Sequence, residues 1–134
     1  MAPDAGLPDD GIVREQIPVH LDHVGPGWHP LLLGLHEHLL AVSPGYSVQQ
    51  VKEKYGGLRV QLYTGLLRHL NTGNTDWPDP DHAARMKAED DAAMTLVRSA
   101  ERESTRICEA CGDPGESRGD AWIKTLCDNC ATSR

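Results

Sequence analysis

The chain has 134 residues, of which 39% are apolar, 25% charged and only 4% aromatic, so it has room for one ordinary globular domain and not for two. A net charge of −7 at pH 7 argues against a protein that coats nucleic acid non-specifically, because phosphate binding needs clustered Lys and Arg. No run of about 18 apolar residues and no secretory signal is present, so we expect a cytoplasmic protein with no membrane partner.

Residues 1–18 are expected to form a flexible tail, because they are rich in Pro, Gly and Asp and offer little apolar surface to offset the entropy of ordering. An α-helix is predicted for residues 28–42, since Pro30 suits a first turn and apolar side chains recur at spacings of three and four. That apolar stripe consists of Trp28, Leu32, Leu35, Leu39 and Val42. The Ser-Pro-Gly sequence at residues 43–45 ends the helix.

A β-hairpin is predicted for residues 46–63, with Gly56-Gly57 as a turn that tolerates positive φ. In its second arm the inward positions alternate with outward ones. The inward set is Leu58, Val60 and Leu62, and the outward set is Arg59, Gln61 and Tyr63.

The hairpin also contains the one positively charged stretch of the chain, because residues 41–70 carry four basic and one acidic side chain. One interpretation is a phosphate or nucleic-acid contact made by Lys52, Lys54 and Arg59, with Tyr55 stacked on a base. The other is a hairpin with a polar outer face and with Tyr55 packed against the helix, and the sequence favours this second reading because hairpin tips are normally Gly-rich and charged.

Residues 64–80 are rich in Asn, Gly, Pro and Asp, so we expect a loop with room for one helical turn. A long helix is then predicted to about Arg106, capped by Asp79 or Asp81, with acidic residues early and arginines late as the helix dipole favours. One face of this helix carries a stripe of mostly small residues, which indicates close packing or a partner. The stripe comprises Met86, Ala93, Val97, Ala100 and Ser104.

The strongest signal is the pair of motifs Cys108-x2-Cys111 and Cys127-x2-Cys130, separated by 15 residues. This spacing is typical of structural zinc sites, and four thiolates leave no open position for water, so the expected cofactor is structural Zn²⁺. Free or redox-active thiols are the less favoured alternative, because two such pairs at this spacing are otherwise hard to explain. A short strand is predicted around residues 122–126, with Trp122 or Ile123 covering the site.

Five of the seven histidines lie between His20 and His38. The sequence favours solvated histidines over a second metal site, because His36 and His38 point to different sides of a helix and the HExxH pattern is absent. No Ser-His-Asp or Cys-His triad can be assembled, so the chain is predicted not to be an enzyme, with a small enzyme as a less favoured alternative.

Four segments, GWHPLLLGLHEHL, QQVKEKYGGLRVQLY, AERESTRICEACGDPGES and WIKTLCDNC, resemble a family of small uncharacterised proteins of phages and actinobacteria over residues 25–130. That family's hairpin typically reads KEKFGGLR followed by an aromatic residue, so Tyr55 here replaces a Phe and Val60 departs from the pattern. The family's last metal ligand is often His, where this chain has Cys130. The resemblance implies the domain boundaries and the zinc site, and no activity. Residues 98–130 are also similar to the zinc-finger end of the DksA/TraR transcription regulators. Those proteins use a helical hairpin with acidic residues at its tip, whereas this chain has a β-hairpin upstream. The similarity therefore leaves a polymerase-binding role unsupported.

The sequence thus predicts one α+β domain, in which a helix packs on a β-hairpin, a long second helix follows, and a C-terminal four-Cys zinc ribbon closes the helix end. Residues 19–107 form the body and residues 108–134 the ribbon. The predicted function is a zinc-stabilised, non-catalytic interaction module that binds another protein in a regulatory or phage/host context; the alternative is a nucleic-acid-binding regulator. The predicted binding surface comprises Lys52, Lys54, Tyr55, Arg59, Arg118 and Lys124.

Overall fold

The computed structural model describes residues 15–71 and 80–132. Two 3-10 helices, η1 (Ile17–His23) and η2 (Pro26–Trp28), lead into α1 (His29–Val42). The strands β1 (Ser47–Lys54) and β2 (Gly57–Tyr63) form an antiparallel hairpin, and α2 (Gly65–Asn71) and the long α3 (Pro80–Ser104) follow. The C-terminal end consists of β3 (Glu116–Arg118), β4 (Lys124–Leu126) and α4 (Asp128–Thr132). The predicted α+β fold is confirmed.

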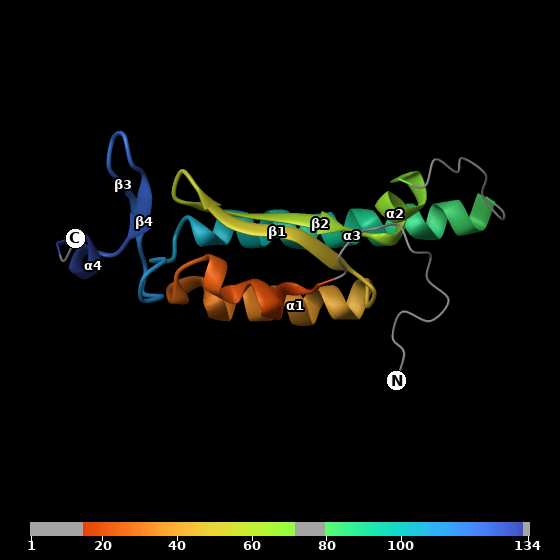
Figure 1. Ribbon diagram of the computed structural model, residues 1–134, viewed down its shortest axis with the longest axis horizontal. Coiled ribbons are helices and arrows are strands. Elements are labelled where there is room, and N and C mark those ends of the chain that lie inside the picture. The colour runs from red at the N-terminus through yellow and green to blue at the C-terminus, as the bar shows by residue number, and fades with distance from the viewer. Residues whose placement is uncertain (1–14, 72–79, 133–134) are drawn as a thin grey trace.

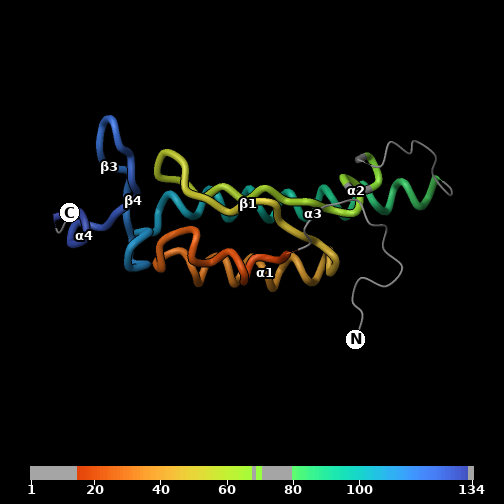
Figure 2. Tube along the Cα trace, viewed as in Figure 1, coloured from red at the N-terminus to blue at the C-terminus, as the bar shows by residue number. Residues whose placement is uncertain are grey.

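The molecule is elongated and has two layers (Figure 1). One layer holds α1 with η1, and the other holds the β1–β2 hairpin together with α3, which runs along β2. The trace in Figure 2 shows β3, β4 and α4 together at one end, next to the tip of the hairpin and the end of α3. No helix among the described residues is long and apolar enough to cross a membrane.

The core lies between the two layers and is mostly aliphatic. Of the stripe predicted on α1, Leu32, Leu35 and Leu39 are buried, whereas Val42 in the last turn is partly exposed. Trp28 is fully buried just before α1, and its indole Nε1–H donates a hydrogen bond to the Ile107 carbonyl at 2.9 Å. The predicted small-residue stripe of α3 is buried from Ala93 to Ser104, so the α3 backbone can approach the hairpin and α1 closely.

Both edges of the β1–β2 sheet are covered, although among the described residues no third strand joins this sheet. Side chains of α3 accept hydrogen bonds from β2: Ser104 Oγ from the Leu58 N–H at 2.9 Å, and Glu101 Oε2 from the Val60 N–H at 3.0 Å. On the other edge the Val48 N–H donates to the Glu15 carbonyl at 2.8 Å. Covered edges stabilise a hairpin that would be marginal alone, and they fix α3 alongside β2.

The hairpin turn lies one residue earlier than the sequence indicated. Lys54 pairs with Gly57, so the two turn residues are Tyr55 and Gly56, both with positive φ, of 54° and 83°. Positive φ at both central positions matches the right-handed twist of a hairpin. The Glu53 carboxylate accepts a hydrogen bond from the Gly56 N–H at 2.6 Å and supports this conformation.

The ends of several elements differ from the expectations. Ile17, assigned to the tail by the sequence, is fully buried at the start of η1, so ordered structure begins before Val19; residues 1–14 lie outside the described part. The helix expected as one turn within residues 64–80 spans seven residues as α2. The first turn of α3 contains Asp81, and the other candidate cap, Asp79, lies outside the described residues.

Candidate metal centre

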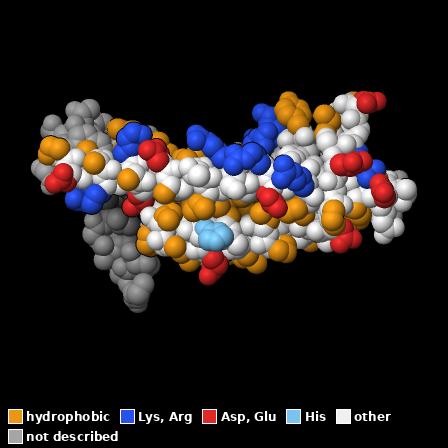
Figure 3. Space-filling view, turned by 180° about the vertical axis from the view of Figure 1, so that it is seen from behind, with side chains coloured by type: hydrophobic (Ala, Val, Ile, Leu, Met, Phe, Trp, Pro, Cys, Tyr) orange, Lys and Arg blue, Asp and Glu red, His pale blue; other side chains and the backbone are white. Residues whose placement is uncertain are grey.

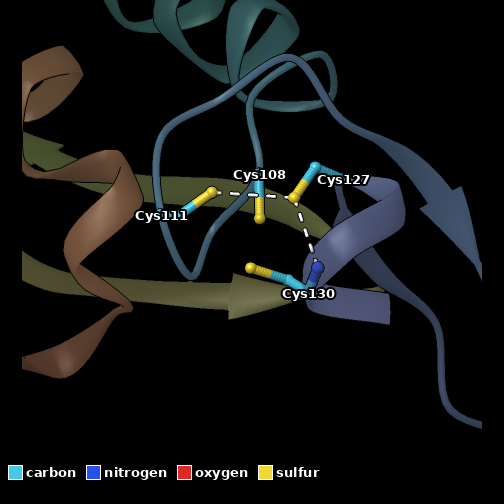
Figure 4. A group of neighbouring side chains, drawn as sticks. All are labelled: Cys108, Cys111, Cys127 and Cys130. Atoms are coloured by element: carbon cyan, nitrogen blue, oxygen red, sulfur yellow. Dashed lines mark hydrogen bonds between the residues drawn. The ribbon is translucent and has the colours of Figure 1, made fainter. Parts of the chain in front are cut away.

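Four cysteine side chains converge at the ribbon end of the molecule (Figure 4). Cys108 and Cys111 come from the turn after α3, and Cys127 and Cys130 from the junction of β4 and α4. Their sulfur atoms all lie within 4.8 Å of one another, and Cys111 Sγ and Cys127 Sγ are 3.6 Å apart. Tetrahedral zinc with Zn–S bonds of about 2.3 Å requires sulfur atoms about 3.8 Å apart, so the arrangement fits a single metal ion.

Each pair of cysteines is held by a tight local turn. The Gly112 N–H donates to the Cys108 carbonyl at 2.9 Å, and Gly112 itself has a φ of 89°, a conformation that glycine adopts without strain. In the second turn the Cys130 N–H points at Cys127 Sγ, 3.4 Å away. Backbone N–H groups directed at sulfur stabilise negative charge there, which suits thiolate ligands.

The thiols differ in acidity because their surroundings differ. Burial acts to raise the pKa of Cys108, but backbone N–H groups of Cys127, Cys111 and Ala110 outweigh it and lower that pKa to about 6. Hydrogen bonds to the neighbouring sulfurs raise the pKa of Cys130 to about 12. The cluster therefore holds protons that must leave when a cation binds, so metal affinity falls as the pH falls.

The first cysteine turn rests directly on the segment that precedes α1. The Gly27 N–H donates to the Glu109 carbonyl at 2.7 Å, and the Gly25 N–H to Glu109 Oε2 at 3.0 Å. A Cβ atom on Gly27 would lie 2.0 Å from the Cys108 carbonyl oxygen and 2.5 Å from the Gly112 nitrogen, so only glycine fits at this contact. The metal centre is thus joined to the body by backbone contact.

The second contact joins the ribbon to the hairpin tip. The buried Thr125 hydroxyl donates to the Gly56 carbonyl. Lys124 Nζ lies 3.1 Å from Glu53 Oε1 and 3.4 Å from Glu109 Oε1. Partial burial lowers the pKa of Lys124, but these two carboxylates outweigh that effect and raise it. The ribbon therefore contacts η2, the hairpin and the end of α3 at once.

The cover of the site differs from the expectation. Trp122 does not cover the cysteines, because 71% of its surface is exposed in the loop between β3 and β4. Ile123 lies near Gly56 of the hairpin. The apolar residues that pack beside the cysteines are Leu126 and Ala131. Alternation along a strand predicts the face of a residue, but which face meets the metal depends on how the ribbon docks on the body.

The predicted binding residues fall into two groups. Lys52, Lys54 and Arg59 are exposed on the hairpin, and Tyr55 is 73% exposed at its tip, so it does not pack against a helix. The two ribbon residues are engaged within the molecule. Arg118 contacts the Asp128 carboxylate at 2.5 Å and donates to the Leu126 carbonyl at 2.8 Å, while Lys124 pairs with Glu53 and Glu109.

The five histidines between His20 and His38 are solvated to different degrees: His23 and His38 are exposed as expected, and His29 and His36 are partly buried. His20 is buried, contacts the ring of His23 edge-on, and lies 3.5 Å from Glu15 Oε1. His36 Nδ1 is 2.6 Å from the Tyr46 hydroxyl. Within residues 15–71 and 80–132, the four cysteines are the only group of three or more His, Cys, Asp or Glu side chains placed to share a metal ion.

Comparisons with protein-family models, with curated protein sequences and with solved structures found no match.

Proposed function

We propose that this protein is a zinc-stabilised, non-catalytic interaction module. The observation that carries the proposal is the convergence of four cysteine sulfurs within 4.8 Å of one another. A set of four thiolates in tetrahedral reach selects zinc over the oxygen-preferring cations. Because four protein ligands fill the coordination sphere, the ion has no position for water or substrate and serves to stabilise the fold.

The docking of the ribbon explains why a metal is useful to this protein. The ion would join the turn after α3 to the turn before α4, and the joined ribbon contacts both Gly27 and the hairpin tip at Gly56. Zinc binding of this kind supplies on the order of 10 kcal/mol to a small fold. A single ion can therefore rigidify one whole end of the molecule, which favours a fixed binding surface there.

The experiment is metal analysis of untagged protein combined with thermal unfolding. We expect about one equivalent of zinc per chain, a large fall in the unfolding midpoint on treatment with a chelator, and recovery when zinc is restored. A Cys127→Ser variant should behave like the chelated protein, because it removes a buried ligand. Zinc far below one equivalent, or a midpoint that does not respond to chelator, would contradict the proposal.

A further inference from the structure

Six basic side chains form one surface that the sequence did not reveal as a unit. Lys52 and Arg59 lie directly opposite each other on β1 and β2, and Lys54 follows on the same strand face as Lys52. The long helix α3 and the turn after it add three arginines at spacings of four residues. We call this set the basic surface; it consists of Lys52, Lys54, Arg59, Arg98, Arg102 and Arg106, all exposed.

The two elements present these residues side by side because α3 is held along β2 by its hydrogen bonds to Leu58 and Val60. Arg59 connects the two halves. It lines one shallow hollow with the two hairpin lysines and another, of about 560 Å³, with the three arginines. The space-filling view from behind shows Lys and Arg side chains gathered over the middle of the molecule (Figure 3).

The charges of the basic surface are not neutralised within the described part of the chain. None of its six members forms an ion pair with a described carboxylate, whereas Arg118 and Lys124 both do. Glu101 lies in both hollows, where its Oε2 accepts a hydrogen bond from the Val60 N–H, so one negative charge faces six positive ones. Like charges directly across a hairpin, or four residues apart on a helix, destabilise the fold. Six cations without an ion pair to a described carboxylate, gathered on one surface of a chain of net charge −7, favour a polyanionic partner.

An exposed aromatic ring lies beside Lys54 at the tip of the hairpin. Tyr55 projects from the hairpin tip, with Lys54 Nζ 5.5 Å from the centre of its ring. Trp122 is also exposed, in the β3–β4 loop. Cationic grooves combined with exposed aromatic rings bind single strands, because unpaired bases stack on the rings while the backbone follows the charges.

We propose that the basic surface, together with Tyr55, binds single-stranded nucleic acid. Phosphates lie along the lysines and arginines of the hairpin and α3, and a base stacks on Tyr55. This inference rests on the proposed function, because the zinc-bound ribbon holds the hairpin tip that carries Tyr55. A single strand fits better than a duplex or an acidic protein, since it alone offers both phosphates and free base faces.

The test is fluorescence anisotropy of zinc-loaded protein with short labelled oligothymidylate and oligouridylate over a range of salt concentrations. We expect binding at low salt that weakens linearly on a log–log plot as salt rises. An Arg98→Ala/Arg102→Ala variant should bind much more weakly, with a slope shallower by about 1.4, since each phosphate contact on a single strand contributes about 0.7. The matched control is Arg85→Ala/Lys87→Ala, which removes two exposed charges of the same helix outside the basic surface and should bind like wild type.

Tyr55→Ala separates stacking from charge. It should weaken binding about five-fold or more at every salt concentration without changing the slope, because stacking does not release counterions. The inference is overturned if the protein does not bind oligonucleotides at low salt, or if it binds a duplex of the same length with equal affinity. It is also overturned if Arg98→Ala/Arg102→Ala and the control Arg85→Ala/Lys87→Ala lose the same amount of affinity. Recovery from the host of a nuclease-resistant protein partner whose binding needs Arg98 and Arg102 would also overturn it.

Failure of the inference can be told from failure of the proposed function. Zinc content and the chelator response are measured on the same preparation as oligonucleotide binding. A protein with one zinc and a chelator-sensitive midpoint that binds no oligonucleotide contradicts only the nucleic-acid inference. A protein that binds oligonucleotides but holds no zinc contradicts the zinc module and the role of zinc in holding Tyr55, and leaves the basic surface as the binding site.

Discussion

Replacing Gly27 with alanine tests whether the metal centre is joined to the body as the structure indicates. The added Cβ would lie 2.0 Å from the Cys108 carbonyl oxygen and 2.7 Å from that of Glu109, both backbone atoms. Backbone cannot move aside as a flexible side chain can, so the turn must shift by roughly 1 Å to reach an ordinary contact distance. That shift would break the 2.7 Å hydrogen bond from Gly27 to Glu109 and strain the one from Gly25 to the Glu109 carboxylate.

The magnitude follows from these two bonds. A neutral hydrogen bond contributes about 1 kcal/mol and one to a charged group about 2 kcal/mol, so Gly27→Ala should lower the free energy of unfolding by about 3 kcal/mol. For a chain of this size that corresponds to a fall of about 10 °C in the unfolding midpoint. The assay is thermal unfolding followed by circular dichroism, with zinc bound throughout.

Gly34→Ala is the matched control, since Gly34 lies within α1 and a Cβ there would meet nothing within 4 Å. Alanine in a helix interior is more favourable than glycine by about 0.5–1 kcal/mol, so this variant should unfold a few degrees higher than wild type. If Gly27→Ala unfolds at the wild-type temperature, the ribbon does not rest on this segment, and a metal bound by the cysteines does not stabilise the body through it.

Two further predictions concern the body. Ser104→Ala should lower the free energy of unfolding, measured in denaturant, by about 1–3 kcal/mol, because it leaves the buried Leu58 N–H without its partner. The control Ser99→Ala, at an exposed position of the same helix, should change that free energy by less than about 0.5 kcal/mol. Equal effects of the two variants would contradict the role of α3 in covering β2. Burial raises the pKa of Tyr46 from 10.0 to about 12, despite an opposing hydrogen bond from Ile17. The folded state therefore holds the phenolic proton more tightly than the unfolded state. This difference contributes about 3 kcal/mol to the free energy of unfolding, which is complete below pH 10 and is lost as the pH rises to about 12. Denaturant titrations across this pH range should show that the free energy of unfolding falls in wild type and not in Tyr46→Phe. If the free energies of the two proteins change with pH in parallel, the prediction is wrong.

Much of the local structure is predictable from the sequence, because it depends on neighbouring residues. The apolar stripe with Pro30 in its first turn predicts α1 to within a residue. The alternation around Leu58, Val60 and Leu62 predicts β2, although Tyr63, expected to face outward, is buried, and the turn falls on Tyr55-Gly56. The convergence of the four cysteines likewise follows from the spacing of the two motifs, because each short loop can direct both of its sulfurs to one point.

The main helices, the hairpin and the four-cysteine cluster are predictable from the sequence, since periodicity, turn residues and Cys spacing act over a few positions along the chain. Which charged side chains are paired within the molecule and which are not depends on the packing of the whole fold. Lys124 is neutralised by Glu53, 71 residues away, while Arg98 and Arg102 come to lie beside Arg59 because α3 covers the edge of β2. Such pairings depend on how the layers pack, and packing is set by the whole buried surface and not by any local pattern.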